Sequence, residues 1–160
     1  MGEVTPAQFG LLGYMQSLTV MHYGRKAERR AQGFAFSCIE EYLLLRGRLW
    51  NREDWRKPFG FAMMTPKQCF DNAYWLASSR VGLRYVEGYA TSVIPILHAW
   101  CVDGNDQVID LTWREFSHTN EVPSYFGAVF PLATVKACRS ARNCSVLQDW
   151  ENGYPVLRAQ

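Results

Sequence analysis

The chain has 160 residues, of which 48% are hydrophobic and 20% are charged. A chain of this length and composition is expected to fold as one domain, residues 1–160, around a substantial buried core. Its net charge of +2 gives no indication of a nucleic-acid partner, since such proteins concentrate many Lys and Arg residues on one face. No stretch approaches the roughly 20 apolar residues that span a bilayer, so we expect no membrane partner either.

The basic residues form two clusters that also contain acidic residues. The clusters cover residues 25–30 and 46–57, and Glu28, Glu53 and Asp54 lie within them. Mixed charge of this kind is typical of a solvated helix face or loop. An electrostatic docking surface is the minority alternative.

The five cysteines are odd in number and widely spaced, unlike a disulfide framework. They are Cys38, Cys69, Cys101, Cys138 and Cys144. Residues 9–20 are interrupted by glycine and polar residues, and they lack the basic start and the cleavage site of a signal peptide. We therefore expect a cytoplasmic protein with reduced thiols.

Two helices are predicted before residue 48. Thr5-Pro6-Ala7-Gln8 is a capping box with Pro at the first helical position, and the helix should run from Thr5 into the first basic cluster, with Gly24 as a break or kink. Its apolar residues at helical spacing are Phe9, Leu12, Met15 and Leu18, with Leu11 and Met21 nearby. A second capping box, Ser37 to Glu40, opens a shorter helix that should end at Gly47.

Residues 48–64 show no clear periodicity, although they include Trp50, Trp55 and Phe61. We expect an irregular loop here. The preferred interpretation is that the loop packs against the core, and the alternative is that it covers a cleft. If the loop does cover a cleft, the aromatic residues between Trp50 and Phe61 are the first place to look for substrate contacts.

Residues 65–130 are expected to form a helix followed by a sheet. Thr65-Pro66-Lys67-Gln68 repeats the cap signature and would put Cys69 near the fourth position of a helix that ends at Ser78 or Ser79. The predicted strands are Tyr85–Ala90, Ile94–Val102, Gln107–Thr112 and Tyr125–Phe130, with a turn at residues 103–106.

A helix over Thr134–Arg142 and an ambiguous tail from Ser145 complete the chain. The predicted fold class is therefore α+β, with N-terminal helices in residues 1–64 packed on a mostly antiparallel sheet. Residues 131–160 form the C-terminal helix and tail.

Cys69, His98 and Asp110, in this order along the chain, have the chemistry of one nucleophilic site. Cys69 lies near a helix start, where free amides and the helix dipole favour a thiolate and can stabilise an oxyanion. His98 could act as the base that accepts the thiol proton, and Asp110 could orient the imidazole of His98. Each residue alone is more often structural, although an acid between Ile109 and Leu111 requires a partner if it is buried.

The register of the hairpin decides whether His98 and Asp110 share a face of the sheet. Residues directly opposite each other share a face, and a symmetrical two- or four-residue turn at Gly104-Asn105 would set Asp110 against Ala99 instead. We therefore predict a connection of three or five residues, or a bulge, between the two strands.

Together these residues resemble the transglutaminase-like branch of the papain-like cysteine enzymes. The matching pieces are Cys69 with Asn72-Ala73, the strand Tyr85–Ala90, His98-Ala99-Trp100, and Asp110-Leu111-Thr112-Trp113, all within residues 65–130. The resemblance implies a papain-like core in which Cys69 is the nucleophile, His98 the general base and acid, and Asp110 the residue that orients the imidazole.

Two features depart from the family pattern. Pro95 precedes His98 and suggests an edge or an irregular entry to that strand. We identify no separate glutamine upstream of the thiol that would serve as the oxyanion donor found in papain. Gln68 adjoins Cys69, but it is interpreted first as part of the helix cap. The resemblance allows an indole N–H, from Trp50 or Trp55, to serve instead.

The implied function is acyl transfer through a thioester on Cys69, with a peptide, a protein or another amide-containing compound as substrate. Water as the acceptor makes the protein a hydrolase (a thiol protease, amidase or deamidase), and an amine makes it a transglutaminase. The alternative from another class is a non-catalytic module that binds a peptide or protein on the same fold. The sequence leaves the oligomeric state open.

No cofactor or metal is expected. His22 and His118 have no cysteine pair nearby at ligand spacing, and Cys138 and Cys144 are six positions apart, so a structural zinc site is not indicated. Neither a Gly-rich phosphate loop nor a nicotinamide fingerprint is present.

Overall fold

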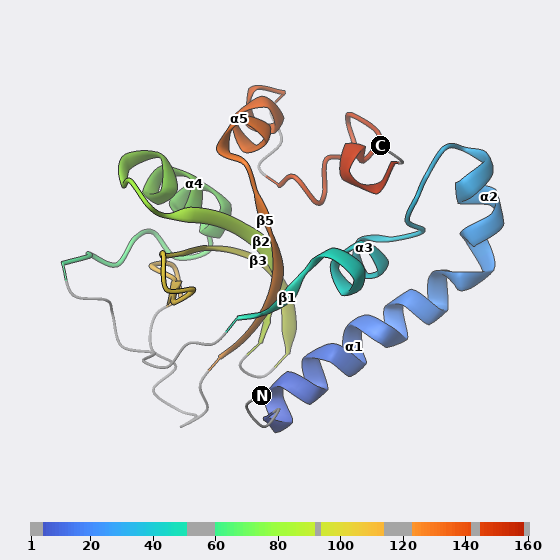
Figure 1. Cartoon of the computed structure of the whole chain (residues 1–160), viewed down its shortest axis with the longest axis horizontal. Coiled ribbons are helices and arrows are strands. Elements are labelled where there is room, and N and C mark those ends of the chain that lie inside the picture. The colour runs from blue at the N-terminus through green and yellow to red at the C-terminus, as the bar shows by residue number, and fades with distance from the viewer. Residues whose placement is uncertain (1–4, 51–59, 92–93, 114–122, 142–144, 159–160) are drawn as a thin grey trace.

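The computed structural model describes residues 5–50, 60–91, 94–113, 123–141 and 145–158. A five-stranded sheet has the order β1-β5-β2-β3-β4, with every pair antiparallel (Figure 1). Its strands are β1 (Arg48–Trp50), β2 (Arg84–Thr91), β3 (Pro95–Val102), β4 (Val108–Ile109) and β5 (Ser124–Phe130). The helices are α1 (Pro6–His22), α2 (Lys26–Ala31), α3 (Ile39–Arg46), α4 (Cys69–Ser79) and α5 (Leu132–Ser140), with 3-10 helices η1 (Tyr23–Arg25) and η2 (Pro155–Leu157). The predicted α+β class with a mostly antiparallel sheet is confirmed.

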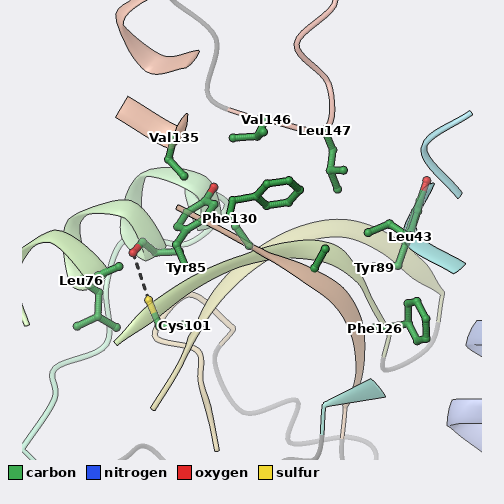
Figure 2. Close-up of a cluster of buried hydrophobic side chains, with 14 of the residues drawn as sticks. Leu43, Leu76, Tyr85, Tyr89, Cys101, Phe126, Phe130, Val135, Val146 and Leu147 are labelled. Atoms are coloured by element: carbon green, nitrogen blue, oxygen red, sulfur yellow. Dashed lines mark hydrogen bonds between the residues drawn. The ribbon is translucent and has the colours of Figure 1, made fainter. Parts of the chain in front are cut away.

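The larger core lies on the face of the sheet that the helices cover. Figure 2 shows Leu43 of α3, Leu76 of α4, Val135 of α5 and Leu147 of the C-terminal segment gathered over the strands. Leu11 and Met15 of α1 belong to the same cluster. The helices from both ends of the chain therefore cover one face together.

The smaller core lies on the other face, toward which the sheet curls. Trp50 of the edge strand β1 and Val108 of the opposite edge strand β4 belong to one cluster with Trp100 and Tyr125. Side chains of the two outermost strands meet in this way only if the sheet bends round them. We call this face the concave face.

A group of charged side chains joins the two edges of the curled sheet. Arg48 of β1 lies 2.7 Å from Asp106, in the turn before β4, and Arg84 of β2 pairs with the same carboxylate. Arg84 also donates to the carbonyl oxygen of Asp103 at 2.9 Å. The guanidinium of Arg48 lies 3.9 Å from the ring centroid of Trp50, so these ion pairs close over the end of the concave core.

Two glycines lie beside His98 across the sheet. The register pairs Gly127 of β5 with Gly88 of β2, and Gly88 with His98 of β3. A Cβ atom at Gly127 would lie 2.5 Å from the Glu87 carbonyl oxygen and 2.6 Å from the Trp100 ring. The missing side chains therefore leave the room on the concave face that aromatic rings from neighbouring positions occupy.

The N-terminal cap and the break at Gly24 are confirmed. Thr5 and Gln8 form a reciprocal capping box, and η1 separates α1 from α2 at Gly24. The predicted buried face of α1 is wrong in part. Phe9 and Met21 are 75% and 76% exposed, whereas the predicted Met15 and the nearby Leu11 are buried and pack α1 on the sheet.

The cap of α3 is shifted by one residue from the predicted box. The N-cap is Cys38 rather than Ser37, and its thiol accepts a hydrogen bond from the Glu41 amide at 3.4 Å. The Glu41 carboxylate in turn accepts from the Ser37 amide at 2.6 Å and the Ser37 hydroxyl at 2.7 Å. The predicted end at Gly47 is confirmed.

Three predicted boundaries differ from the structure. The expected loop over residues 48–64 begins with strand β1, while residues 51–59 of it lie outside the described ranges. The expected strand Gln107–Thr112 is reduced to Val108–Ile109, and α5 begins at Leu132 rather than Thr134. The strand boundaries are set by pairing partners elsewhere in the chain, and α5 begins directly after Pro131.

The first basic cluster lies on a solvated helix, and the second lies partly outside the described residues. α2 has no buried residue, which fits a solvated helix face, whereas residues 52–57 of the second cluster fall in an undescribed range. Among the helices that the structure describes, none has the length and apolar character needed to cross a bilayer.

Candidate active site

The nucleophile candidate lies at the first residue of α4. Gln68 is the N-cap, and its carbonyl accepts the Asn72 amide at 2.9 Å. The predicted cap at Thr65 is therefore wrong, because Lys67 adopts a left-handed φ of 65° and turns the chain before the helix begins. Cys69 is thus closer to the helix N-terminus than the fourth position, among amides that have no partner within the helix.

Asn72, one turn after Cys69, fixes the position of this helix end. Its side-chain amide donates to the Thr65 carbonyl at 2.7 Å and to the Thr112 hydroxyl at 2.9 Å. The residue therefore links the turn before α4 to the segment that follows β4. The sequence indicated Asn72 only as part of the family resemblance, and its two partners are apparent only from the structure.

The hairpin places His98 and Asp110 on the same side of the sheet. β3 and β4 pair Cys101 with Ile109 and Val102 with Val108, which leaves residues 103–107 as a five-residue connection, as predicted. Continued by one residue, this register sets Asp110 opposite Trp100. Asp110 is therefore diagonal to His98 and on the same face of the sheet. His98 Nε2 lies 2.7 Å from Asp110 Oδ2, and the two residues are 3% and 1% exposed.

Pro95 takes the place expected for it. It is the first residue of β3, and β4 pairs with β3 only at Cys101 and Val102. Within the described part of the chain, His98 therefore lies on a stretch of β3 that has β2 as its sheet neighbour and no strand on the other side.

Both oxygens of Asp110 have several donors. Oδ1 accepts the backbone amides of Thr112 at 2.9 Å and Trp113 at 3.2 Å. Oδ2, which faces His98, also accepts the Tyr125 hydroxyl at 3.0 Å. A carboxylate buried this deeply requires such partners, and the segment after β4 supplies two of them by turning back over the side chain.

The electrostatics favour a charged imidazole. Burial acts to lower the pKa of His98, but the charge and hydrogen bond of Asp110 outweigh it, and the net effect raises this pKa to about 9. Burial likewise acts to raise the pKa of Asp110, and the charge of His98 and the hydrogen bonds bring it below its ordinary value. At neutral pH the pair is therefore an imidazolium and a carboxylate.

Cys69 contacts the same imidazole. A side-chain hydrogen bond and a charge interaction with the thiol contribute to the raised pKa of His98. Because Asp110 engages Nε2, the nitrogen left for the thiol is Nδ1. An imidazolium in this position stabilises the thiolate of an adjacent cysteine. The structure thus brings together all three residues that the sequence singled out.

Aromatic rings shield the imidazole from water. The ring of Trp113 lies 4.9 Å from that of His98 between centroids, and those of Trp100 and Tyr125 lie at 6.3 Å and 6.4 Å. Tyr125 comes from β5 and was not recognised from the sequence as part of the site. Its ring packs among these aromatic side chains, and its hydroxyl donates to Asp110.

One suggested oxyanion donor is wrong. The indole N–H of Trp50 donates to the Gly127 carbonyl at 3.0 Å, deep in the concave core, so it is committed elsewhere. Trp55 lies outside the described residues. Gln68 makes no side-chain capping bond. The first-turn amides of α4 are the donors that the described structure places beside the thiol.

The cysteines in the described ranges are free thiols, namely Cys38, Cys69, Cys101 and Cys138. Over the same ranges, no group of three or more His, Cys, Asp or Glu residues is arranged to hold a metal ion. No family model, curated protein or solved structure matches this chain.

Proposed function

We propose that this protein is a cysteine-dependent acyl-transfer enzyme of the transglutaminase-like, papain-like kind, with Cys69 as the nucleophile. The observation that carries the proposal is the buried His98–Asp110 pair beside a thiol at a helix N-terminus. A charged pair with so little exposure is costly to bury, and buried groups whose pKa values are shifted by a charged partner are common at functional sites.

The chemistry follows from the geometry. The Cys69 thiolate attacks the carbonyl carbon of an amide, and the first-turn amides of α4 donate hydrogen bonds to the developing oxyanion. The His98 imidazolium then donates its Nδ1 proton to the leaving amine as the C–N bond breaks, which leaves a thioester on Cys69 and a neutral imidazole. Asp110 holds the ring and its Nε2 proton throughout.

The second half of the reaction reverses the proton transfer. A water molecule or an amine attacks the thioester carbonyl while His98 Nδ1 removes its proton, and the Cys69 thiolate departs. The product is an acid with water and a new amide with an amine. The proposed substrate is a peptide, a protein or another amide-containing compound.

A burst experiment with p-nitrophenyl acetate tests the proposal. The enzyme should release close to one equivalent of nitrophenolate rapidly and carry an acetyl group on Cys69, as detected by mass spectrometry of its peptides. Cys69→Ala should abolish the burst, whereas Cys138→Ala, which removes another buried thiol, should keep it. A burst that survives Cys69→Ala would assign the nucleophile to another residue, and the absence of any burst would leave the non-catalytic binding module as the better account.

A further inference from the structure

A cavity separate from the candidate active site lies on the opposite side of β2 from β3 and β4. It has a volume of about 490 Å³ and is formed by α3, the end of β5, the start of α5 and η2, whose places are shown in Figure 1. None of the residues that line it belongs to α4, β3 or β4. Cavities that take small molecules commonly measure roughly 300–1,000 Å³.

The charged side chains that line this groove are all basic. Arg46 and Arg158 line it, and no Asp or Glu is among its lining residues in the described structure. Arg158 donates to the carbonyls of Gly153 and Gln32, so its hydrogen bonds hold it in place without neutralising it. The groove therefore carries two positive charges with no carboxylate among its lining residues.

Several donors at the groove are uncommitted. Arg46 contacts the ring of Phe36 at 6.0 Å but makes no hydrogen bond or ion pair with any residue of the described ranges. The hydroxyls of Tyr42 and Thr134 likewise have no partner within those ranges. α5 also begins here without a side-chain cap. These groups all donate, which suits an anion with several acceptor oxygens.

The remaining wall is aromatic and apolar. Phe36 packs edge-on against Tyr42 with centroids 5.2 Å apart, and Tyr42 stacks on Phe130 at 6.2 Å. Val156 of η2 also lines the groove. We propose that this groove binds a small aromatic ligand that carries an anionic group, with the ring against Phe36 and Tyr42 and the anion at Arg46 and Arg158.

Phenyl phosphate, titrated calorimetrically into the full chain, tests this proposal. Saturable 1:1 binding with a Kd on the order of 1 mM or below is expected for a ligand of this size. Phenol lacks the anion and inorganic phosphate lacks the ring, so each should bind about tenfold more weakly or worse.

Variants locate the site. Arg46→Gln should raise the Kd about tenfold or more, since it removes a charged hydrogen-bond donor, while Arg30→Gln changes an exposed arginine elsewhere and should leave it unchanged. Arg158→Gln should likewise raise the Kd about tenfold or more, since it removes the second charged donor of the groove. Circular dichroism checks that each variant is folded.

The proposal is overturned if binding is not saturable, if phenol binds as tightly as phenyl phosphate, or if both Arg46→Gln and Arg158→Gln leave the Kd unchanged. Cys69→Ala should bind phenyl phosphate as the unmodified protein does. Failure of the acyl-transfer proposal would therefore not be mistaken for failure of this one.

Discussion

Asp110 shows most directly how a single residue is held for the proposed chemistry. Each of its carboxylate oxygens accepts two hydrogen bonds, and only one of the four comes from His98. The other three hold the carboxylate in place independently of the imidazole. A fixed carboxylate selects the tautomer and the orientation of the ring, which is the role expected of the third member of a triad.

Asp110→Asn should therefore lower the rate of Cys69 acetylation on the order of 10³-fold, because an amide cannot hold the imidazolium or accept all four bonds. Tyr125→Phe removes one donor and leaves the bond to His98, so its rate should fall about tenfold or less. Stopped-flow release of nitrophenolate measures both rates. Equal losses in the two variants would contradict this division of roles.

At the scale of elements, the C-terminal segment is held to the sheet by one buried carboxylate. Glu87 of β2 accepts the Val146 amide at 2.8 Å and the Leu147 amide at 3.0 Å. The hydroxyls of Tyr85 and Ser145 donate to it at 2.7 Å and 2.9 Å. Burial raises the pKa of Glu87, and these hydrogen bonds oppose the shift. The segment that packs Leu147 into the core thus depends on this side chain.

Glu87→Gln should lower the free energy of unfolding by about 2–4 kcal/mol, because the new amide group would face donors it cannot accept from. Glu151→Gln makes the same chemical change at an exposed position and should alter the stability by less than about 0.5 kcal/mol. Urea denaturation measures both values. If the two variants were equally stable, Glu87 would not hold the segment in place.

The glycine pair is the second feature at this scale. Gly127→Ala would bring a methyl group against the Glu87 carbonyl and the Trp100 ring, so β5 or Trp100 must move. We expect a loss of about 1–3 kcal/mol in unfolding free energy. Gly104→Ala, at a turn position with open space, is the matched control and should cost much less. Thermal melts of the two variants should separate clearly, and coinciding melts would refute the packing argument.

At the scale of the whole molecule, the buried ion pair makes stability depend on pH. His98 binds its proton more tightly in the folded state, because its pKa rises from 6.5 to about 9. The stabilisation is complete below pH 6.5 and is lost as pH rises through 9, since between these values the folded state holds a proton that the unfolded state has released. The total is at most about 3 kcal/mol.

Unfolding free energies measured in urea between pH 6 and 8, below the range in which the buried thiols begin to contribute, should therefore decline in the unmodified protein. In His98→Gln this decline should be absent, although the variant is less stable at pH 6. A parallel decline in both proteins would assign the effect to other groups.

Local signals explain why part of the fold could be predicted. The cap at Thr5 and the end at Gly47 depend on neighbouring residues, and the parity of the β3–β4 connection follows from the period of two along a strand. Strand β1 could not be predicted, because three residues gain strand geometry only by pairing with β5, far along the chain. The same distance hid the bond from Trp50 to Gly127.

The candidate site divides in the same way. Cys69, His98 and Asp110 were indicated by their chemistry and order in the sequence. Tyr125 and the partners of Asn72 were not, because their contacts join β5 and α4 to the segment after β4. Residues that support a site through tertiary contacts leave little trace in local sequence.

The most direct test of the central claim is the rate at which each thiol reacts with iodoacetamide as a function of pH, followed by mass spectrometry. Burial raises the pKa of Cys38, and that of Cys101 to about 12, so both should react slowly at neutral pH. Cys69, paired with the His98 imidazolium, should react at least tenfold faster than the other four below pH 7, and His98→Gln should remove this difference. If Cys69 is no more reactive than the others, or its reactivity is unaffected by His98→Gln, the proposed nucleophile is wrong.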